Sequence, residues 1–309
     1  MGSQTGDLKM SFFKMFVEYL PHGFAFASLG LTTATMYPHV WGIESYKDLI
    51  KIDNKDNFDQ EIFILAEEIK RDFNWKPNNF IKKDLCEIIP SSQMEFTSRG
   101  TMTSKWGAVI GTPVFFSSES IKNAQQNPHI LHKYNIDLSS KYGAQLFDTF
   151  KLSRDAKKFA LAREMCHVNT YQVFINSVWC GFMAMSCYPL AATLAGLLRF
   201  RRALLFSSVL VVPLVSKSFL KASSYYNSNV ETKCDRLAAK ISIDVAKGGV
   251  EYYDAQIKRK NMLIELSGNI ESPVEIKDYF LLQSTNLSLE DKRDLLLDAI
   301  KELYPSGEI

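Results

Sequence analysis

The sequence lacks the marks of a disulfide scaffold and of a nucleic-acid-binding protein. Its five cysteines form no Cys-x-x-Cys pair and are few for a chain of 309 residues. The 36 lysines and arginines nearly balance the 34 aspartates and glutamates, and the net charge of +2 indicates no nucleic-acid partner. A charged fraction of 23% and an aromatic fraction of 12% exclude a disordered chain.

Charged residues are also missing from three long segments, although the mean hydropathy of the whole chain is only −0.09. No Asp, Glu, Lys or Arg lies between Glu18 and Glu44, or from Val168 to Leu198. The run from Ala203 to Ser216 is strongly apolar, and it reaches spanning length if it continues to Leu220 with Lys217 at the interface. Because a helix needs about 20 apolar residues to cross a bilayer, the sequence predicts an integral membrane protein in contact with lipid.

These segments divide the chain into regions. They are an N-terminal segment (1–20), a first transmembrane helix (21–41), a soluble α+β region (42–167), a second transmembrane helix (168–198), a basic loop (199–202), a third transmembrane helix (203–220) and a C-terminal helical region (221–309). For the first span, a buried core helix or a signal sequence stays an alternative. For the other two the alternative is a soluble helical hairpin.

The positive charges predict an orientation. Three arginines in the loop Arg-Phe-Arg-Arg favour a membrane hairpin whose loop stays on the side from which the protein is inserted. The two soluble regions then face the opposite side together. A first span returns the N-terminus, with Lys9 and Lys14, to the side of the loop.

Apolar spacing predicts the main elements of the first soluble region. Apolar residues three and four positions apart predict an amphipathic helix over Asn57–Asn74. The run Gly107–Phe116 is rich in glycine and β-branched residues and predicts a strand. The polar stretch Ser117–Tyr142, which holds His129 and His132, is predicted to be a long, solvent-exposed loop.

Serine residues mark the start of two further helices. Ser153 predicts a capped helix over Leu152–Val168, and Ser288 predicts a capped final helix. The segment Ser228–Val245 is also predicted to be helical. The pair Gly248-Gly249 predicts a break in the chain after it.

One helix carries a metallopeptidase motif with one residue changed. The run Arg163-Glu-Met-Cys-His167 differs at its first position from His-Glu-x-x-His, in which two histidines hold zinc and the glutamate acts as base. The later run Ser228–Ala238 resembles the Ser-x-x-Glu-x-x-x-Asp-x-x-Ala helix of integral-membrane peptidases of the prenyl-protein and heat-shock group. The resemblance implies an α+β fold with a degenerate peptidase-like helical core, a small β element and a transmembrane helical hairpin.

The first position of the motif limits the chemistry that this resemblance allows. Arg163 stands where the first zinc ligand is expected, and a permanently charged guanidinium cannot coordinate zinc. The degenerate metal-site positions are Arg163, Glu164, His167, Glu231 and Asp235. We expect no catalytic residue, metal or cofactor. A cysteine-containing zinc site with Cys166, His167 and Cys234 stays an alternative.

Without a metal, the carboxylates of the second helix need another cation. Glu231 and Asp235 are one helical turn apart, and two partly buried carboxylates in proximity are costly unless a cation compensates them. We therefore expect Arg163 to donate to one of them and to link the two helices. The alternative is a surface arginine on an ordinary amphipathic helix.

Two short runs carry a narrower resemblance. Leu152–Glu164 (LSRDAKKFALARE) and Ala246–Ala255 (AKGGVEYYDA) resemble the transmembrane protein 177 family of the mitochondrial inner membrane, whose order of one span, a soluble region and a hairpin also matches. The resemblance implies a multi-pass protein of that membrane. It also implies a role in the biogenesis of cytochrome c oxidase subunit II, in association with the assembly chaperone of that subunit.

Three functions follow as hypotheses. The first, favoured by the missing ligand and the family resemblance, is a non-catalytic assembly or scaffold factor, a pseudoenzyme that holds a membrane client. The second is an active membrane zinc metallopeptidase with an atypical site and Glu164 as base. The third is a membrane-anchored module that binds extended peptides along a candidate edge strand. The residues of that strand are Gly107, Val109, Gly111 and Val114.

Overall fold

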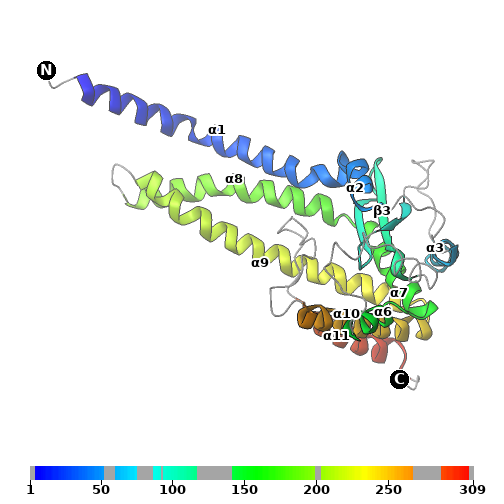
Figure 1. The fold of residues 1–309 in the computed structure, drawn as a ribbon. Helices are drawn as coiled ribbons and strands as arrows, with labels where there is room; N and C mark the ends of the chain where they lie inside the picture. The colour runs from blue at the N-terminus through cyan, green and yellow to red at the C-terminus, as the bar shows by residue number, and fades with distance from the viewer. Residues whose placement is uncertain are drawn as a thin grey trace.

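The protein consists of a long helical stalk attached to a globular domain (Figure 1). The computed structural model describes residues 4–51, 60–74, 86–91, 93–116, 141–198, 203–266 and 287–305, and in the first helix it describes side chains from Glu18 onward. The basic loop 199–202 and the predicted loop with His129 and His132 lie outside the described residues.

The stalk contains the three segments that the sequence marks by their lack of charge. They form α1 (Gln4–Val40), α8 (Gln172–Leu198) and the first part of α9 (Ala203–Ala239). Among the described helices, α8 and α9 are long and apolar enough to cross a membrane, whereas α1 falls below that threshold. The first span therefore stays a prediction.

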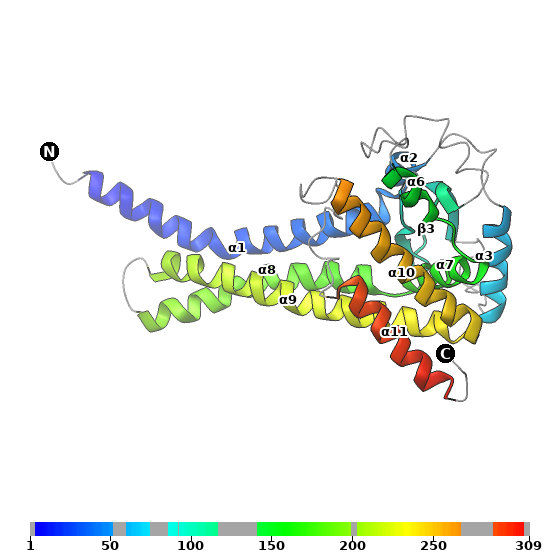
Figure 2. The ribbon, with the colours of Figure 1, turned by 60° about the horizontal axis from the view of Figure 1, so that its bottom comes forward.

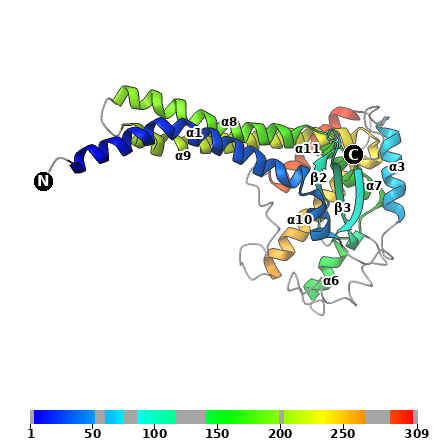
Figure 3. The ribbon, with the colours of Figure 1, turned by 90° about the horizontal axis from the view of Figure 1, so that it is seen from above.

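Helix α1 nevertheless lies along α8 (Figures 1 and 3). The Ser28 hydroxyl donates to the Gly181 carbonyl of α8 at 2.7 Å, and a Cβ on Gly181 would lie 2.0 Å from Thr32 Oγ1. Small residues allow helices in a membrane to approach this closely. The N-terminal end of α1 lies at the end of the stalk where α8 ends and α9 begins, as the predicted orientation requires (Figure 1).

A three-stranded sheet lies in the globular domain, with β3 in its centre. The order is β1 (Cys86–Ser91), β3 (Gly107–Pro113) and β2 (Thr97–Thr101), with β3 parallel to β1 and antiparallel to β2. Every residue of β3 is buried. The prediction of an edge strand at Gly107, Val109, Gly111 and Val114 is therefore wrong, because both sides of β3 are paired. Val114 opens the short 3₁₀ helix η2 (Val114–Phe116).

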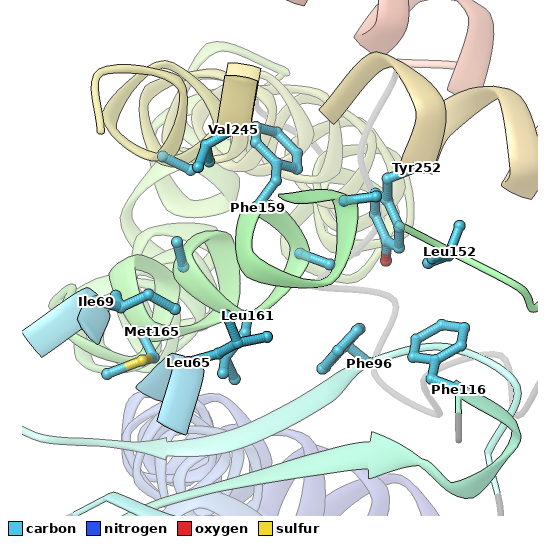
Figure 4. Close-up of a cluster of buried hydrophobic side chains, with 14 of the residues drawn as sticks. Leu65, Ile69, Phe96, Phe116, Leu152, Phe159, Leu161, Met165, Val245 and Tyr252 are labelled. Carbon is cyan, nitrogen blue, oxygen red and sulfur yellow. The ribbon is translucent and has the colours of Figure 1, made fainter. Parts of the chain in front are cut away.

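Helix α7 (Arg154–Val168) is the centre of the hydrophobic core (Figure 4). Its residues Phe159, Leu161 and Met165 are fully buried. On one side they meet α3 (Gln60–Asp72) and the sheet, and on the other α10 (Ile243–Leu266). A helix buried on several sides in this way is held rigidly, so that its polar side chains are placed accurately relative to neighbouring elements.

The predicted break at Gly248 and Gly249 is wrong. The chain turns earlier, after Ala239, and α10 runs through both glycines. Their role is close packing, because a Cβ on Gly248 would lie 2.5 Å from the Ala156 nitrogen of α7, and one on Gly249 would lie 2.7 Å from the Phe159 ring. The glycines thus bring α10 against α7 (Figure 2).

The capping serines are confirmed. The Ser153 side chain accepts from the Ala156 N–H at the start of α7. Ser288 and Asp291 form a reciprocal capping box at the start of α11 (Leu289–Leu303). The short helices α2 (Ile43–Ile50) and α6 (Lys141–Asp148) were not expected from the sequence.

Replacing Gly181 by leucine tests the contact between α1 and α8. The larger side chain would displace Thr32 and the α1 main chain, and overpacking of this kind costs about 1–3 kcal/mol. We expect Gly181→Leu to lower the thermal unfolding temperature of the solubilised protein. The matched control is Gly196→Leu in the same helix, where a Cβ meets nothing within 4 Å. Equal stability of the two variants would contradict the contact.

Candidate functional site

The residues of the altered peptidase motif meet where α7 crosses α9. Arg163 and Glu164 are on α7, and Glu231 and Asp235 are on the part of α9 that continues beyond the predicted span into the globular domain. Their side chains are between 6% and 15% exposed, so all four are largely removed from solvent. The structure thus brings together four of the five predicted positions as one cluster, with His167 one turn further along α7.

Arg163 contacts all three carboxylates. Its Nε donates to Asp235 Oδ1 at 2.8 Å, its Nη1 donates to Glu164 Oε1 at 2.6 Å, and its Nη2 lies 3.4 Å from Glu231 Oε2. The expected link between the two helices through Arg163 is therefore present. The contact with Glu164, the next residue in the chain, was not expected. We call these four residues the Arg163 cluster.

Side chains from three other elements complete the Arg163 cluster. The Tyr253 hydroxyl of α10 donates to Asp235 Oδ2 at 2.8 Å, and the Ser98 hydroxyl of β2 donates to Glu164 Oε2 at 2.7 Å. Lys292 of α11 forms an ion pair with Glu231. Sequence reasoning missed these three residues. Tyr253 lies within one of the runs that carry the family resemblance, whereas no local pattern marks Ser98 or Lys292.

Burial and the ion pairs shift the pKa values of Glu231 and Asp235 in opposite directions. Burial raises the pKa of Asp235, and the charge of Arg163 and the bond from Tyr253 offset only part of this effect. Burial also acts to raise the pKa of Glu231, but the positive charges of Arg163 and Lys292 outweigh it and hold that pKa below its ordinary value. The second cation, Lys292, therefore keeps Glu231 ionised beside the two other carboxylates.

These residues do not fit a zinc ion. The guanidinium of Arg163 lies between the carboxylates that a metal would bind and already pairs with them. Burial raises the pKa of Cys166 to about 12 and raises the pKa of Cys234 further, so both remain protonated thiols. Within the described part of the chain, no group of three His, Cys, Asp or Glu residues is arranged to hold a metal ion.

A cavity of about 190 Å³ adjoins the Arg163 cluster. It lies at the base of the stalk, where β2, α7 and the first turn of α8 meet. Charged and polar residues form most of its wall: His39, Ser98, Arg99, Arg163, Glu164, His167, Thr170, Gln172 and Glu231. The four residues of the wrongly predicted edge strand are not part of this wall, and the neighbouring strand β2 takes their place.

Removing the guanidinium tests how much the Arg163 cluster stabilises the fold. Arg163→Ala leaves three buried carboxylates with one remaining cation, and breaking a buried pair costs about 3–5 kcal/mol. We expect a large fall in thermal stability. The control is Arg154→Ala on the same helix, since Arg154 is 50% exposed where it pairs with Glu68 and such pairs are worth about 0–1 kcal/mol.

Two outcomes would contradict this interpretation of the Arg163 cluster. One is an Arg163→Ala variant as stable as the Arg154→Ala variant. The other is one zinc ion per chain in the purified wild-type protein by elemental analysis, because zinc and the guanidinium would compete for the same carboxylates.

His167 gives the site a predicted pH dependence. Burial lowers its pKa below 6.5, and Arg163 adds to this effect while Glu164 opposes it. Below pH 6.5 this histidine takes up a proton in the unfolded chain, whereas in the folded protein it does so only at a lower pH. The free energy of unfolding therefore falls as the pH decreases from 6.5 toward the lowered pKa. We expect thermal unfolding of His167→Gln to depend less on pH in this window than that of the wild type. Parallel pH profiles would refute the prediction.

Comparison with known proteins identifies the family of the chain. The family model described as transmembrane protein 177 matches residues 50–285, which is more than half of the sequence. Human transmembrane protein 177 is 32% identical over 170 residues, which cover 52% of this chain and 53% of the human protein. The zebrafish protein is 24% identical over 206 residues, covering 63% and 66%, and the mouse protein 29% over 179 residues, covering 52% and 53%.

The chain therefore spans about half the length of the mammalian relatives that it matches. No solved structure matches it. The matched region of the family model begins before β1, includes α7, α8, α9 and α10, and so contains all the residues of the Arg163 cluster. The chain is a membrane protein that belongs to the transmembrane protein 177 family.

Proposed function

We propose that the protein is a non-catalytic scaffold of the mitochondrial inner membrane that holds cytochrome c oxidase subunit II during its assembly, together with the assembly chaperone of that subunit. Membership of the transmembrane protein 177 family supports the proposal, since the resemblance implies this role. The two candidate membrane-spanning helices supply an anchor in the bilayer. The globular domain at the end of the stalk supplies a surface for a client (Figure 2).

The Arg163 cluster is the observation that carries the non-catalytic part of the proposal. In a peptidase of this type the space between the two helices holds the metal, and the glutamate of the motif must be free to accept a proton from water. Here Arg163 pairs with Glu231 and Asp235, and Glu164 is engaged by both Arg163 and Ser98. Each carboxylate oxygen of Glu164 thus already accepts a hydrogen bond from the protein, a geometry that does not leave the group facing a water as a general base must.

The same contacts suit a structural role. The Arg163 cluster joins α7, the helix at the centre of the core, to α9, which enters the stalk. We infer that these contacts hold the stalk and the domain in a fixed arrangement, which a scaffold for a membrane client requires.

Depletion of the protein tests the proposed role. We expect faster turnover of newly made, pulse-labelled subunit II in depleted mitochondria, most clearly under assembly stress, because the subunit loses its holding partner. Wild-type protein should restore normal turnover. Subunit I, labelled in the same experiment, serves as the control. Unaltered level and turnover of subunit II under stress would rule the role out.

The orientation predicted from the basic loop has its own test. With the loop in the matrix, both soluble regions face the intermembrane space and a three-span chain returns its N-terminus to the matrix. After the outer membrane is opened, protease should digest an epitope at the C-terminus and leave one at the N-terminus intact. Protection of the C-terminal epitope would show that the orientation is the opposite of the predicted one. Digestion of both epitopes would show that the first segment does not cross the membrane.

A further inference from the structure

Strand β2 is an edge strand, and its outer side faces the cavity beside the Arg163 cluster. In the sheet order β1-β3-β2, only one side of β2 is paired with β3. The consecutive residues Phe96–Gly100 all line the cavity. His39 accepts from the Gly100 N–H and the Val168 carbonyl accepts from the Met102 N–H, so among the described residues the outward main-chain groups left for a further strand are those at the start of β2.

The direction of the hydrogen bonds shows which groups of β2 face outward. The Gly100 N–H donates to His39 Nδ1 at 3.4 Å, on the side away from β3. Along an antiparallel strand, alternate residues direct their main-chain groups to the same side. The N–H and C=O of Ser98 therefore also point outward, and among the described residues none outside the sheet bonds to them. The edge offers a donor and an acceptor at Ser98.

The charges and the size of the cavity determine which side chain of a bound segment it can accept. Its wall holds two positive side chains, Arg99 and Arg163, and two negative ones, Glu164 and Glu231, so the charges balance. A charged side chain gains little there and would lose its hydration. The volume of about 190 Å³ is room for a side chain.

The place of the cavity in the fold indicates where a segment comes from. Gln172 and Val173, in the first turn of α8, form part of the wall. Because α8 is a candidate membrane span, we expect its first turn, and the cavity with it, to lie near the membrane surface. A juxtamembrane segment of another membrane protein that runs beside α8 would therefore meet the residues of β2 that share this wall.

We propose that an extended juxtamembrane segment of a partner membrane protein adds to the outer edge of β2 as a further strand, pairs with the main chain of Ser98 and places an uncharged side chain in the cavity. The inference rests on the proposed scaffold function and names the surface that the client occupies. Recognition through the main chain supplies affinity, and the single cavity supplies a preference for one side chain.

Photo-cross-linking locates the segment without altering the edge. Tyr46 lines the cavity, whereas Tyr171, which is 62% exposed at the base of α8, does not. Each tyrosine is replaced in turn by benzoylphenylalanine in the full chain, in mitochondria whose translation products are radiolabelled. We expect at least tenfold more adduct with a labelled membrane polypeptide from position 46 than from position 171. Equal yields, or an adduct within the chain itself, would overturn the proposal.

A proline substitution tests the main-chain pairing. Ser98→Pro removes the outward N–H without removing a bond to β3, whereas Ser98→Ala keeps the N–H and loses only the hydroxyl bond to Glu164. With benzoylphenylalanine at position 46, we expect Ser98→Pro to reduce the adduct at least tenfold relative to Ser98→Ala. Their thermal unfolding is compared first, and if Ser98→Pro does not fold, the comparison of positions 46 and 171 decides.

The two proposals fail in different ways. In one outcome, labelled polypeptides co-purify with the wild-type chain, but position 46 gives no more adduct than position 171 and Ser98→Pro does not lower the adduct yield. The edge of β2 is then excluded as the binding surface, and the scaffold function stands. If no labelled polypeptide co-purifies with the wild-type chain, the scaffold function fails and the client surface with it.

Discussion

The buried guanidinium of Arg163 is stable in the interior of the protein because three carboxylates surround it. A charge removed from water needs partners with good geometry, and each of the three donor nitrogens of Arg163 faces a different carboxylate. The carboxylates in turn need their own second partners, which Ser98, Tyr253 and Lys292 supply. As a result, one residue connects α7 to α9 directly, and β2, α10 and α11 are joined through its partners.

Glycines at the contacts between helices determine how closely the helices that carry these residues approach each other. Gly248 and Gly249 allow α10 to approach α7 to a distance that any side chain would prevent, and this brings Tyr253 within reach of Asp235. Gly181 plays the same part in the stalk, where α1 approaches α8. Protein interiors are densely packed, so neighbouring side chains cannot move aside to let two helices approach. The small residues therefore set the distance between the helices.

The arrangement explains how a frame that resembles a peptidase can serve another purpose. Arg163 links α7 to α9 through ion pairs, and this link needs no metal ion. The cavity and the outer edge of β2 remain beside it.

Local sequence determined the features whose causes are local. Ser153 and Ser288 predicted helix starts because a cap depends on residues within one turn. Two of the three charge-free segments form helices long and apolar enough to span a membrane, because that property depends on composition. The pairing of Arg163 followed from charge balance between two recognisable helices. Tertiary structure decided the rest: β3 is central only because β1 and β2 both pair with it, and Gly248-Gly249 stays helical only because α7 lies against it. Neighbours distant in the sequence override a local preference whenever their contacts are worth more than the preference itself.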